Sequence, residues 1–162
     1  MQLSELQQLA QQTGQQLIAK NMRLATAESC TGGWVSKVIT DIDGSSQWFE
    51  CALVTYSNQA KHDLLGVSEQ TLRDFGAVSE QTVKQMVLGL LDRCNANLGV
   101  SISGIAGSGG GSDDKPVGTV WIAWAIAGKV VECVRYKFSG NREQVRCEAV
   151  AEALRGVQRH LA

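Results

Sequence analysis

The chain has 162 residues, 44% of them hydrophobic and 19% charged, which is typical of one globular domain with its own core, here over residues 1–162. A net charge of −1 argues against a broad binding surface for nucleic acid or an anionic membrane. No apolar run approaches the roughly 20 residues that span a bilayer. The opening residues lack a signal-peptide pattern, and five scattered cysteines without a C-x-x-C motif favour a reduced, cytoplasmic protein.

The predicted elements alternate along the first half of the chain. Apolar residues at helical spacing over residues 3–18 predict an amphipathic helix, and "RLATAE" at 23–28 predicts a first strand. A short helix over 32–40 follows and ends at the turn "DIDGSS". The apolar, β-branched run "WFECALVTYS" then predicts a second strand over 48–57.

In the second half, the pentapeptide "VSEQT" occurs at 67–71 and at 78–82, each time with a serine suited to cap a helix. We interpret the two copies as two helix starts. Beyond them the pattern predicts a third strand, a glycine-rich loop, a β-hairpin and a last helix, over residues 97–103, 104–118, 119–138 and from about 140 onward.

This alternation of strands and helices predicts a layered α/β fold. Residues 30–46 leave room for a helical crossover, so the first two strands are expected to be parallel, and two further helices before the third strand allow it the same direction. Ser29, Tyr56 and Gly104 each lie just past the carboxyl end of a predicted strand. Ligands bind at that edge in open α/β sheets, so we expect a cleft there.

The stretch "AESCTGG" at 27–33 allows two interpretations. In the first, Ser29 or Thr31 only caps the following helix, and the glycines relieve crowding. In the second, Ser29 is a nucleophile, and free N–H groups of residues 30–33 hold an oxyanion or a phosphate. Neither the G-x-S-x-G pattern nor the P-loop pattern matches the stretch.

A serine nucleophile needs a base, and the chain offers few histidines for that role. His62 and His160 are the only two, which argues against a histidine triad or a multi-histidine metal site. Lys61 lies one helical turn beyond the second predicted strand, and Ser–Lys pairs are a recognised variant of the triad. A solvent-exposed lysine is the ordinary alternative. The parallel arrangement nevertheless places Lys61 beside Ser29.

Two further segments have both a plain and a functional interpretation. The run "SGIAGSGGG" is either a flexible loop or a ligand loop, but Ser112 and the lack of a following helix argue against a dinucleotide fingerprint. Arg142 opens the last helix, where a cation opposes the helix dipole. It is either an exposed arginine paired with a carboxylate or a ligand of a bound anion.

Taken together, eight blocks in their order and spacing resemble the CinA C-terminal domain family, from about Leu6 to the final helix: "AESCTGG", "GSS", "ALVTYSNQAK", "LGV", "FGAVSEQT", "SGIAG", "KPVGTVWIA" and "GNRE". The resemblance implies a three-layer α/β/α fold with a largely parallel or mixed central sheet. It also implies a serine amidohydrolase without metal or cofactor, which converts nicotinamide mononucleotide and water to nicotinate mononucleotide and ammonia in pyridine nucleotide salvage.

The same resemblance assigns roles to individual residues. The family's blocks place the serine nucleophile on Ser29, the lysine base on Lys61, a further catalytic residue on Tyr56 and an arginine on Arg142. Ser108 replaces the proline that is common in the family's glycine loop, which makes the loop less preset in φ. The residues expected to bind substrate are Cys30, Thr31, Gly32, Asn58, Gly104, Gly107 and Arg142.

In the expected mechanism, neutral Lys61 takes the Ser29 proton, for which burial or a nearby cation must lower the lysine pKa. Tyr56 relays or orients the proton, backbone N–H groups after Ser29 hold the oxyanion, and Arg142 with the glycine loop binds the 5′-phosphate. Two alternatives stay open: a non-catalytic nucleotide- or partner-binding module, and a Ser/Lys amidase for another small amide. The expected partners are the nucleotide substrate and a second copy of the chain, with a dimer favoured, but neither nucleic acid nor membrane.

Overall fold

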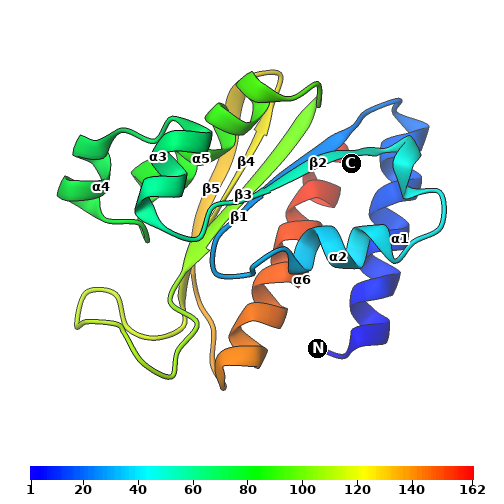
Figure 1. The fold of residues 1–162 in the computed structure, drawn as a ribbon. Helices are drawn as coiled ribbons and strands as arrows, with labels where there is room; N and C mark the ends of the chain where they lie inside the picture. Colours follow the sequence, from blue (N-terminus) through cyan, green and yellow to red (C-terminus); the bar gives the residue numbers. More distant parts are fainter.

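The computed structural model describes residues 1–162 and places one β-sheet between two layers of helices (Figure 1). The helices are α1 (Leu3–Ala19), α2 (Trp34–Thr40), α3 (Asn58–Leu65), α4 (Glu69–Phe75), α5 (Glu80–Arg93) and α6 (Arg142–Leu161), with a short 3₁₀ turn at Ser45–Gln47. The strands are β1 (Leu24–Glu28), β2 (Phe49–Val54), β3 (Leu98–Gly104), β4 (Thr119–Ile126) and β5 (Lys129–Lys137).

The sheet has the order β2-β1-β3-β4-β5 and is mixed. β1 runs parallel to β2 and β3, whereas β4 is antiparallel to both β3 and β5. This confirms the expected α/β/α fold with a mixed sheet and the parallel direction of the first three strands. Glu28 at the end of β1 is in register with Val54 of β2 and Ile102 of β3. The carboxyl ends of the three parallel strands therefore meet at one edge.

Each face of the sheet has its own core. α1, α2 and α6 cover one face around a cluster of 25 buried residues, and α3, α4 and α5 cover the other face around a cluster of 10 (Figure 1). On the larger side, Trp124 is buried and its indole donates to the Ala153 carbonyl of α6 at 3.0 Å. Most of the hydrophobic stabilisation thus lies on the α6 side. The smaller layer carries α3, which forms one wall of the site described below.

Serine side chains cap the starts of three helices, α3, α4 and α5. Ser68 and Ser79, the serines of the two "VSEQT" copies, accept hydrogen bonds from Thr71 N and Thr82 N, so both copies start helices as predicted. The predicted second strand is too long, because β2 ends at Val54. The chain leaves the sheet there, and the Ser57 side chain caps α3 three residues later.

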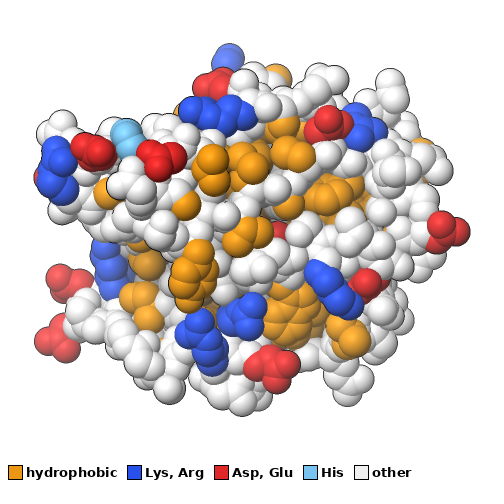
Figure 2. Space-filling model, viewed as in Figure 1, with side chains coloured by type: hydrophobic (Ala, Val, Ile, Leu, Met, Phe, Trp, Pro, Cys, Tyr) orange, Lys and Arg blue, Asp and Glu red, His pale blue; other side chains and the backbone are white.

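The surface agrees with the near-neutral composition. Acidic and basic side chains are interspersed around apolar groups on the face shown in Figure 2. None of the helices combines the length and apolar character that crossing a bilayer requires.

Candidate active site

The site is built around a contact between Ser29 and Lys61. Ser29 directly follows β1, and Lys61 lies on the inward face of α3 with only 1% of its surface exposed. Lys61 Nζ lies 2.8 Å from Ser29 Oγ. The interpretation of Lys61 as an exposed surface lysine is therefore wrong, and the parallel sheet brings the two side chains together as the sequence indicated.

Two backbone carbonyls complete the surroundings of the Lys61 amine. Nζ donates to Thr55 O at 2.8 Å and to Tyr56 O at 3.1 Å, both in the turn between β2 and α3. A neutral amine has two N–H groups and one lone pair. When the two carbonyls take both N–H groups, the lone pair points to Ser29 Oγ. The geometry thus suits Lys61 as the acceptor of the serine proton.

Burial tunes Lys61 for this role. Desolvation lowers the pKa of Lys61 from 10.5 to about 8, because the charged ammonium is disfavoured away from water. An appreciable neutral fraction is therefore present near pH 8, which a solvent-exposed lysine does not offer.

Burial makes Cys30, the neighbour of Ser29, less reactive, in contrast to its effect on Lys61. The Cys30 side chain is nearly buried, and burial raises the pKa of its thiol to about 11. Only a thiolate is a strong sulfur nucleophile, so Cys30 stays an unreactive thiol at neutral pH.

A buried carboxylate shapes the turn that presents Ser29. Glu28 is fully buried, and its carboxylate accepts hydrogen bonds from Thr31 Oγ1 at 2.7 Å, Val35 N at 2.9 Å and Ser36 N at 3.1 Å. The interpretation of Ser29 or Thr31 as the cap of α2 is wrong, because Gly33 occupies the N-cap position and Glu28 satisfies the first turn. Glu28 gave no signal in the sequence beyond being the polar last residue of a strand.

Arg146 of α6 holds the other side of this turn. Its Nε donates to Cys30 O at 2.9 Å, its Nη2 donates to Thr31 O at 3.2 Å, and its guanidinium lies over the Trp34 ring. The N–H groups of Cys30 and Thr31 donate to no oxygen of the chain. Two unpaired backbone donors therefore follow Ser29, as an oxyanion site requires.

A cavity of about 300 Å³ opens next to the Ser29–Lys61 pair. Its walls come from the two turns after β1 and β2, the link between α4 and α5, the end of β3 with the glycine loop, and the start of α6. Seven residues expected from the sequence line it: Ser29, Cys30, Tyr56, Lys61, Gly104, Gly107 and Arg142. Ser103 also lines it and was not singled out from the sequence.

Three expected substrate-binding residues do not line this cavity. The Thr31 hydroxyl is bound to Glu28, so Thr31 offers only its backbone N–H. Gly32 borders a different hollow with Trp34 and Lys37, and Asn58 borders a shallow depression on the outside of α3.

Arg142 joins three segments at the rim of the cavity. Its Nη1 donates to Gly107 O at 2.6 Å, and its Nη2 donates to the Tyr56 hydroxyl at 3.3 Å. Arg142 forms no ion pair with a carboxylate, so the ion-paired interpretation is wrong. The Tyr56 hydroxyl makes no hydrogen bond to Ser29 or Lys61. Tyr56 contacts Lys61 Nζ through its backbone carbonyl and not through its hydroxyl.

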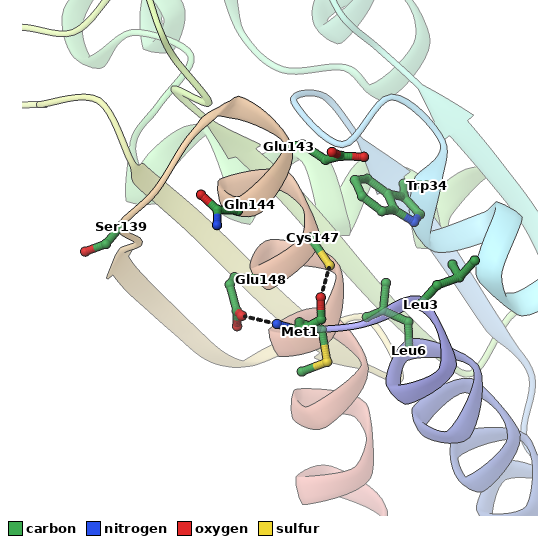
Figure 3. Close-up of a pocket in the computed structure, with 9 residues that line it drawn as sticks. All are labelled: Met1, Leu3, Leu6, Trp34, Ser139, Glu143, Gln144, Cys147 and Glu148. Carbon is green, nitrogen blue, oxygen red and sulfur yellow. Dashed lines mark hydrogen bonds and ion pairs between the residues drawn. The ribbon is translucent and has the colours of Figure 1, made fainter.

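A larger cavity, of about 450 Å³, lies between the starts of α1 and α6 (Figure 3). The Met1 amino group pairs there with Glu148 at 3.5 Å, and the Cys147 thiol lies 3.7 Å from Met1 O. Burial raises the pKa of the Cys147 thiol, and no base is paired with it. The contact between the Ser29 hydroxyl and the Lys61 amine therefore lies in the smaller cavity.

Comparison with known proteins agrees with this architecture. Residues 6–161 match the model of the CinA C-terminal domain. The chain is 57% identical to nicotinamide-nucleotide amidohydrolase PncC of Escherichia coli strain K12, covering 93% of this chain and 92% of the relative. It is 44% identical to PncC of Pseudomonas putida, with 92% of each chain covered.

Solved structures agree as well. The crystal structure of the competence/damage-inducible protein CihA from Agrobacterium tumefaciens superposes with a TM-score of 0.93 at 40% identity, covering 95% of this chain and 94% of that one. A CinA superfamily protein from Klebsiella pneumoniae gives a TM-score of 0.93 at 37% identity, with 96% and 97% covered. By its sequence over residues 6–161 and by its fold, the chain belongs to the CinA C-terminal domain family.

Proposed function

We propose that the protein is a nicotinamide-nucleotide amidase, which hydrolyses nicotinamide mononucleotide to nicotinate mononucleotide and ammonia in pyridine nucleotide salvage. The observation that carries the proposal is the buried Lys61 amine 2.8 Å from Ser29 Oγ at the edge of a cavity. Relatives named nicotinamide-nucleotide amidohydrolase support the choice of substrate. The cavity volume of about 300 Å³ admits the pyridine ring and part of the ribose phosphate.

In the first half of the reaction, neutral Lys61 takes the proton of Ser29 while Ser29 Oγ attacks the carboxamide carbon. The carbonyl oxygen becomes an oxyanion, and the free N–H groups of Cys30 and Thr31 stabilise it. Lys61 is then an ammonium, and the carbonyls of Thr55 and Tyr56 accept two of its N–H groups.

In the second half, the ammonium of Lys61 returns its proton to the amide nitrogen, the C–N bond breaks and ammonia leaves. The nicotinoyl ester of Ser29 remains. Lys61 is again neutral, so it takes a proton from a water molecule as that water attacks the ester carbon. Collapse of this intermediate releases the carboxylic acid while Lys61 returns its proton to Ser29 Oγ, and the acid then loses its proton to solvent to give the carboxylate product.

Arg142 and the glycine loop are our candidates for the 5′-phosphate. Arg142 projects from the first turn of α6 and uses one Nη for the Gly107 carbonyl, which leaves other N–H groups for an anion. The N–H groups of Gly109, Gly110 and Gly111 also donate to no backbone oxygen of the chain. These donors line the same cavity and are exposed to solvent, whereas Lys61 is buried.

Replacing the nucleophile tests the proposal. Ser29→Ala should reduce ammonia release from nicotinamide mononucleotide by about 10⁴-fold or more, because no attacking oxygen remains beside Lys61. The fold should persist, since the serine side chain fills little volume. Ammonia release by the purified protein and the melting temperature are the two measurements.

Cys30→Ala is the matched control at the next position. It removes an unreactive thiol and should keep most of the activity. Near-native turnover by Ser29→Ala would refute the serine mechanism, and absence of ammonia release by the wild-type protein would refute the substrate.

A further inference from the structure

Ser103 is a buried serine whose hydroxyl has no partner in the chain. It lies near the carboxyl end of β3, is 1% exposed, and lines the cavity beside Ser29 and Lys61. No group of the protein is hydrogen-bonded to its Oγ, although most buried hydroxyl groups in proteins find a partner. Because the residue lines the cavity, this hydroxyl is available to a ligand bound there.

Ser101, two residues earlier on the same strand, shows the contrast. Side chains at alternate positions of a strand point to the same face, so both serines face the layer that holds α5. Ser101 is fully buried, and its Oγ donates to Val83 O of α5 at 2.6 Å. The hydroxyl away from the cavity is satisfied by the protein, and the one at the cavity is not.

The register of the sheet places Ser103 beside the nucleophile. Glu28 is paired with Ile102, and Ser29 N continues the ladder by donating to Ile102 O at 3.0 Å. Ser29 and Ser103 are therefore neighbours on adjacent parallel strands, about 4.8 Å apart in backbone spacing. Both side chains point to the face from which Lys61 approaches.

In this arrangement, an amide held for attack by Ser29 meets different groups of the protein at its oxygen and at its nitrogen. The free N–H groups of Cys30 and Thr31 lie on the side of α2, where they suit the carbonyl oxygen. Ser103 lies on the adjacent strand β3 and faces the layer of α5, on the opposite face of the sheet from α2. A primary carboxamide carries an NH₂ group opposite its oxygen, and a serine hydroxyl accepts a hydrogen bond from such a donor.

We infer that Ser103 is a specificity-determining residue whose Oγ accepts a hydrogen bond from the nitrogen of the scissile primary amide. The inference rests on the proposed function and extends it. The contact turns the carbonyl oxygen toward Cys30 N and Thr31 N, and it favours primary amides over esters of the same acid, because an ester offers no N–H at this position.

Two substrates and two variants test the inference. Ser103→Ala is assayed with nicotinamide mononucleotide and with the methyl ester of nicotinate mononucleotide, which has the same acyl group. We expect kcat/KM to fall by about 10-fold to 100-fold for the amide and to stay nearly unchanged for the ester. The melting temperature should not fall, since the substitution breaks no hydrogen bond of the protein.

Ser101→Ala is the matched control. It removes a buried hydrogen bond, so it should lower the melting temperature and leave the amide-to-ester ratio of kcat/KM at its wild-type value. An unchanged amide reaction in Ser103→Ala would overturn the inference, and so would equal losses for amide and ester. Failure of the proposed function is seen separately, as a wild-type protein that releases no ammonia from the mononucleotide.

Discussion

In the proposed mechanism Lys61 acts both as base and as acid, and its surroundings act on its pKa in opposite directions. Desolvation lowers the pKa to about 8, and the Coulombic effect of the neighbouring Cys30 opposes this shift in part. The outcome is an amine that is neutral often enough to accept a proton. Once protonated, it is also acidic enough to deliver that proton to the leaving nitrogen.

The first consequence is a pH dependence of known sign. In the proposed mechanism the active form holds neutral Lys61, so kcat/KM should be low in acid, rise with pH, and level off above the free-enzyme pKa of about 8. Well below that value the slope should be about tenfold per pH unit, since one proton is lost. The measurement is kcat/KM for ammonia release between pH 6 and pH 10, at about unit intervals or finer.

Lys61→Arg is the control for this profile. Arginine keeps the positive charge but does not give up its proton in this range, so activity should fall by about 10²–10⁴-fold at every pH. A wild-type profile centred near the ordinary histidine value would instead identify a histidine as the base. His62 is the nearest one along the chain, and its Nδ1 lies 2.8 Å from Val67 O.

At this scale the sequence indicates the reacting pair but not its support. Ser29 and Lys61 were predictable, because strand ends and family blocks pick them out. Glu28, Ser103 and Arg146 were not, since Glu28 and Arg146 contact the backbone around the turn after β1, and Ser103 lines the cavity with a hydroxyl that forms no hydrogen bond in the chain. Such roles depend on which face a side chain occupies and on what it meets there, and a single sequence does not specify that.

Among the elements, the position of α3 depends on one close approach. Gly89 of α5 lies so near Leu65 at the end of α3 that an added Cβ would stand 1.7 Å from Leu65 O. Only glycine permits this contact, and it fixes the helix that carries Lys61 against the larger helix of the same layer.

Gly89→Ala should therefore destabilise the protein, although alanine is normally the better helix former by about 1 kcal/mol. We expect overpacking to lower the free energy of unfolding by about 1–3 kcal/mol and to reduce kcat as α3 shifts Lys61 away from Ser29. Urea denaturation and ammonia release measure the two effects. Asp92→Ala, on the exposed side of the same helix, should change neither, and a Gly89→Ala protein as stable and active as wild type would contradict this account.

Arg142 connects α6, the glycine loop and the turn before α3, so its substitution tests how the elements close on a nucleotide. Arg142→Ala should raise KM for the mononucleotide by about 10-fold to 100-fold with kcat little changed, if the arginine holds the phosphate equally in ground and transition states. The wild-type protein should prefer the mononucleotide over the riboside, and the variant should lose most of that preference.

Arg155→Ala, which breaks only an ion pair with Glu152 on the outside of α6, is the matched control and should leave both KM values unchanged. Equal hydrolysis of riboside and mononucleotide by the wild-type protein would contradict the proposal that Arg142 binds the 5′-phosphate. The protein would then be described as an amidase for other small amides.

The elements themselves were largely predictable. The hairpin predicted over residues 119–138 is present, and it turns at Ala127 and Gly128, both with positive φ. The helix α3 was missed, because "NQAKHDLL" has little apolar periodicity and is held by its Ser57 cap and by packing against α5. Because the start of α3 was not recognised, the second strand was predicted to extend to Ser57 and not to end at Val54.

Considered whole, the molecule gathers its site from segments spread along the chain, from Ser29 to Arg142. The parallel strands β1, β2 and β3 bring these segments to one edge, which the crossover lengths in the sequence already indicated. The expected dimer concerns surfaces beyond this single chain and stays a prediction.

The placement of potential metal ligands over the whole chain bears on whether the reaction depends on a metal ion. Nowhere do three side chains among histidine, cysteine, aspartate and glutamate gather to hold a metal ion. His160 of α6 is hydrogen-bonded through Nε2 to Glu132 Oε1 of β5 at 3.0 Å. His62 lies in α3, on the opposite side of the sheet. The buried carboxylate nearest the nucleophile, Glu28, is occupied by three hydrogen bonds of its own turn.

With a lysine base and backbone donors for the oxyanion, the proposed reaction needs no Lewis acid. Prolonged treatment with EDTA or 1,10-phenanthroline, followed by removal of the chelator, should leave kcat/KM for ammonia release at its untreated value. A known zinc hydrolase treated in parallel verifies that the chelators act under these conditions. Loss of activity that added zinc restores would contradict the Ser29–Lys61 mechanism, because it would require a metal-activated water where the proposal places a serine.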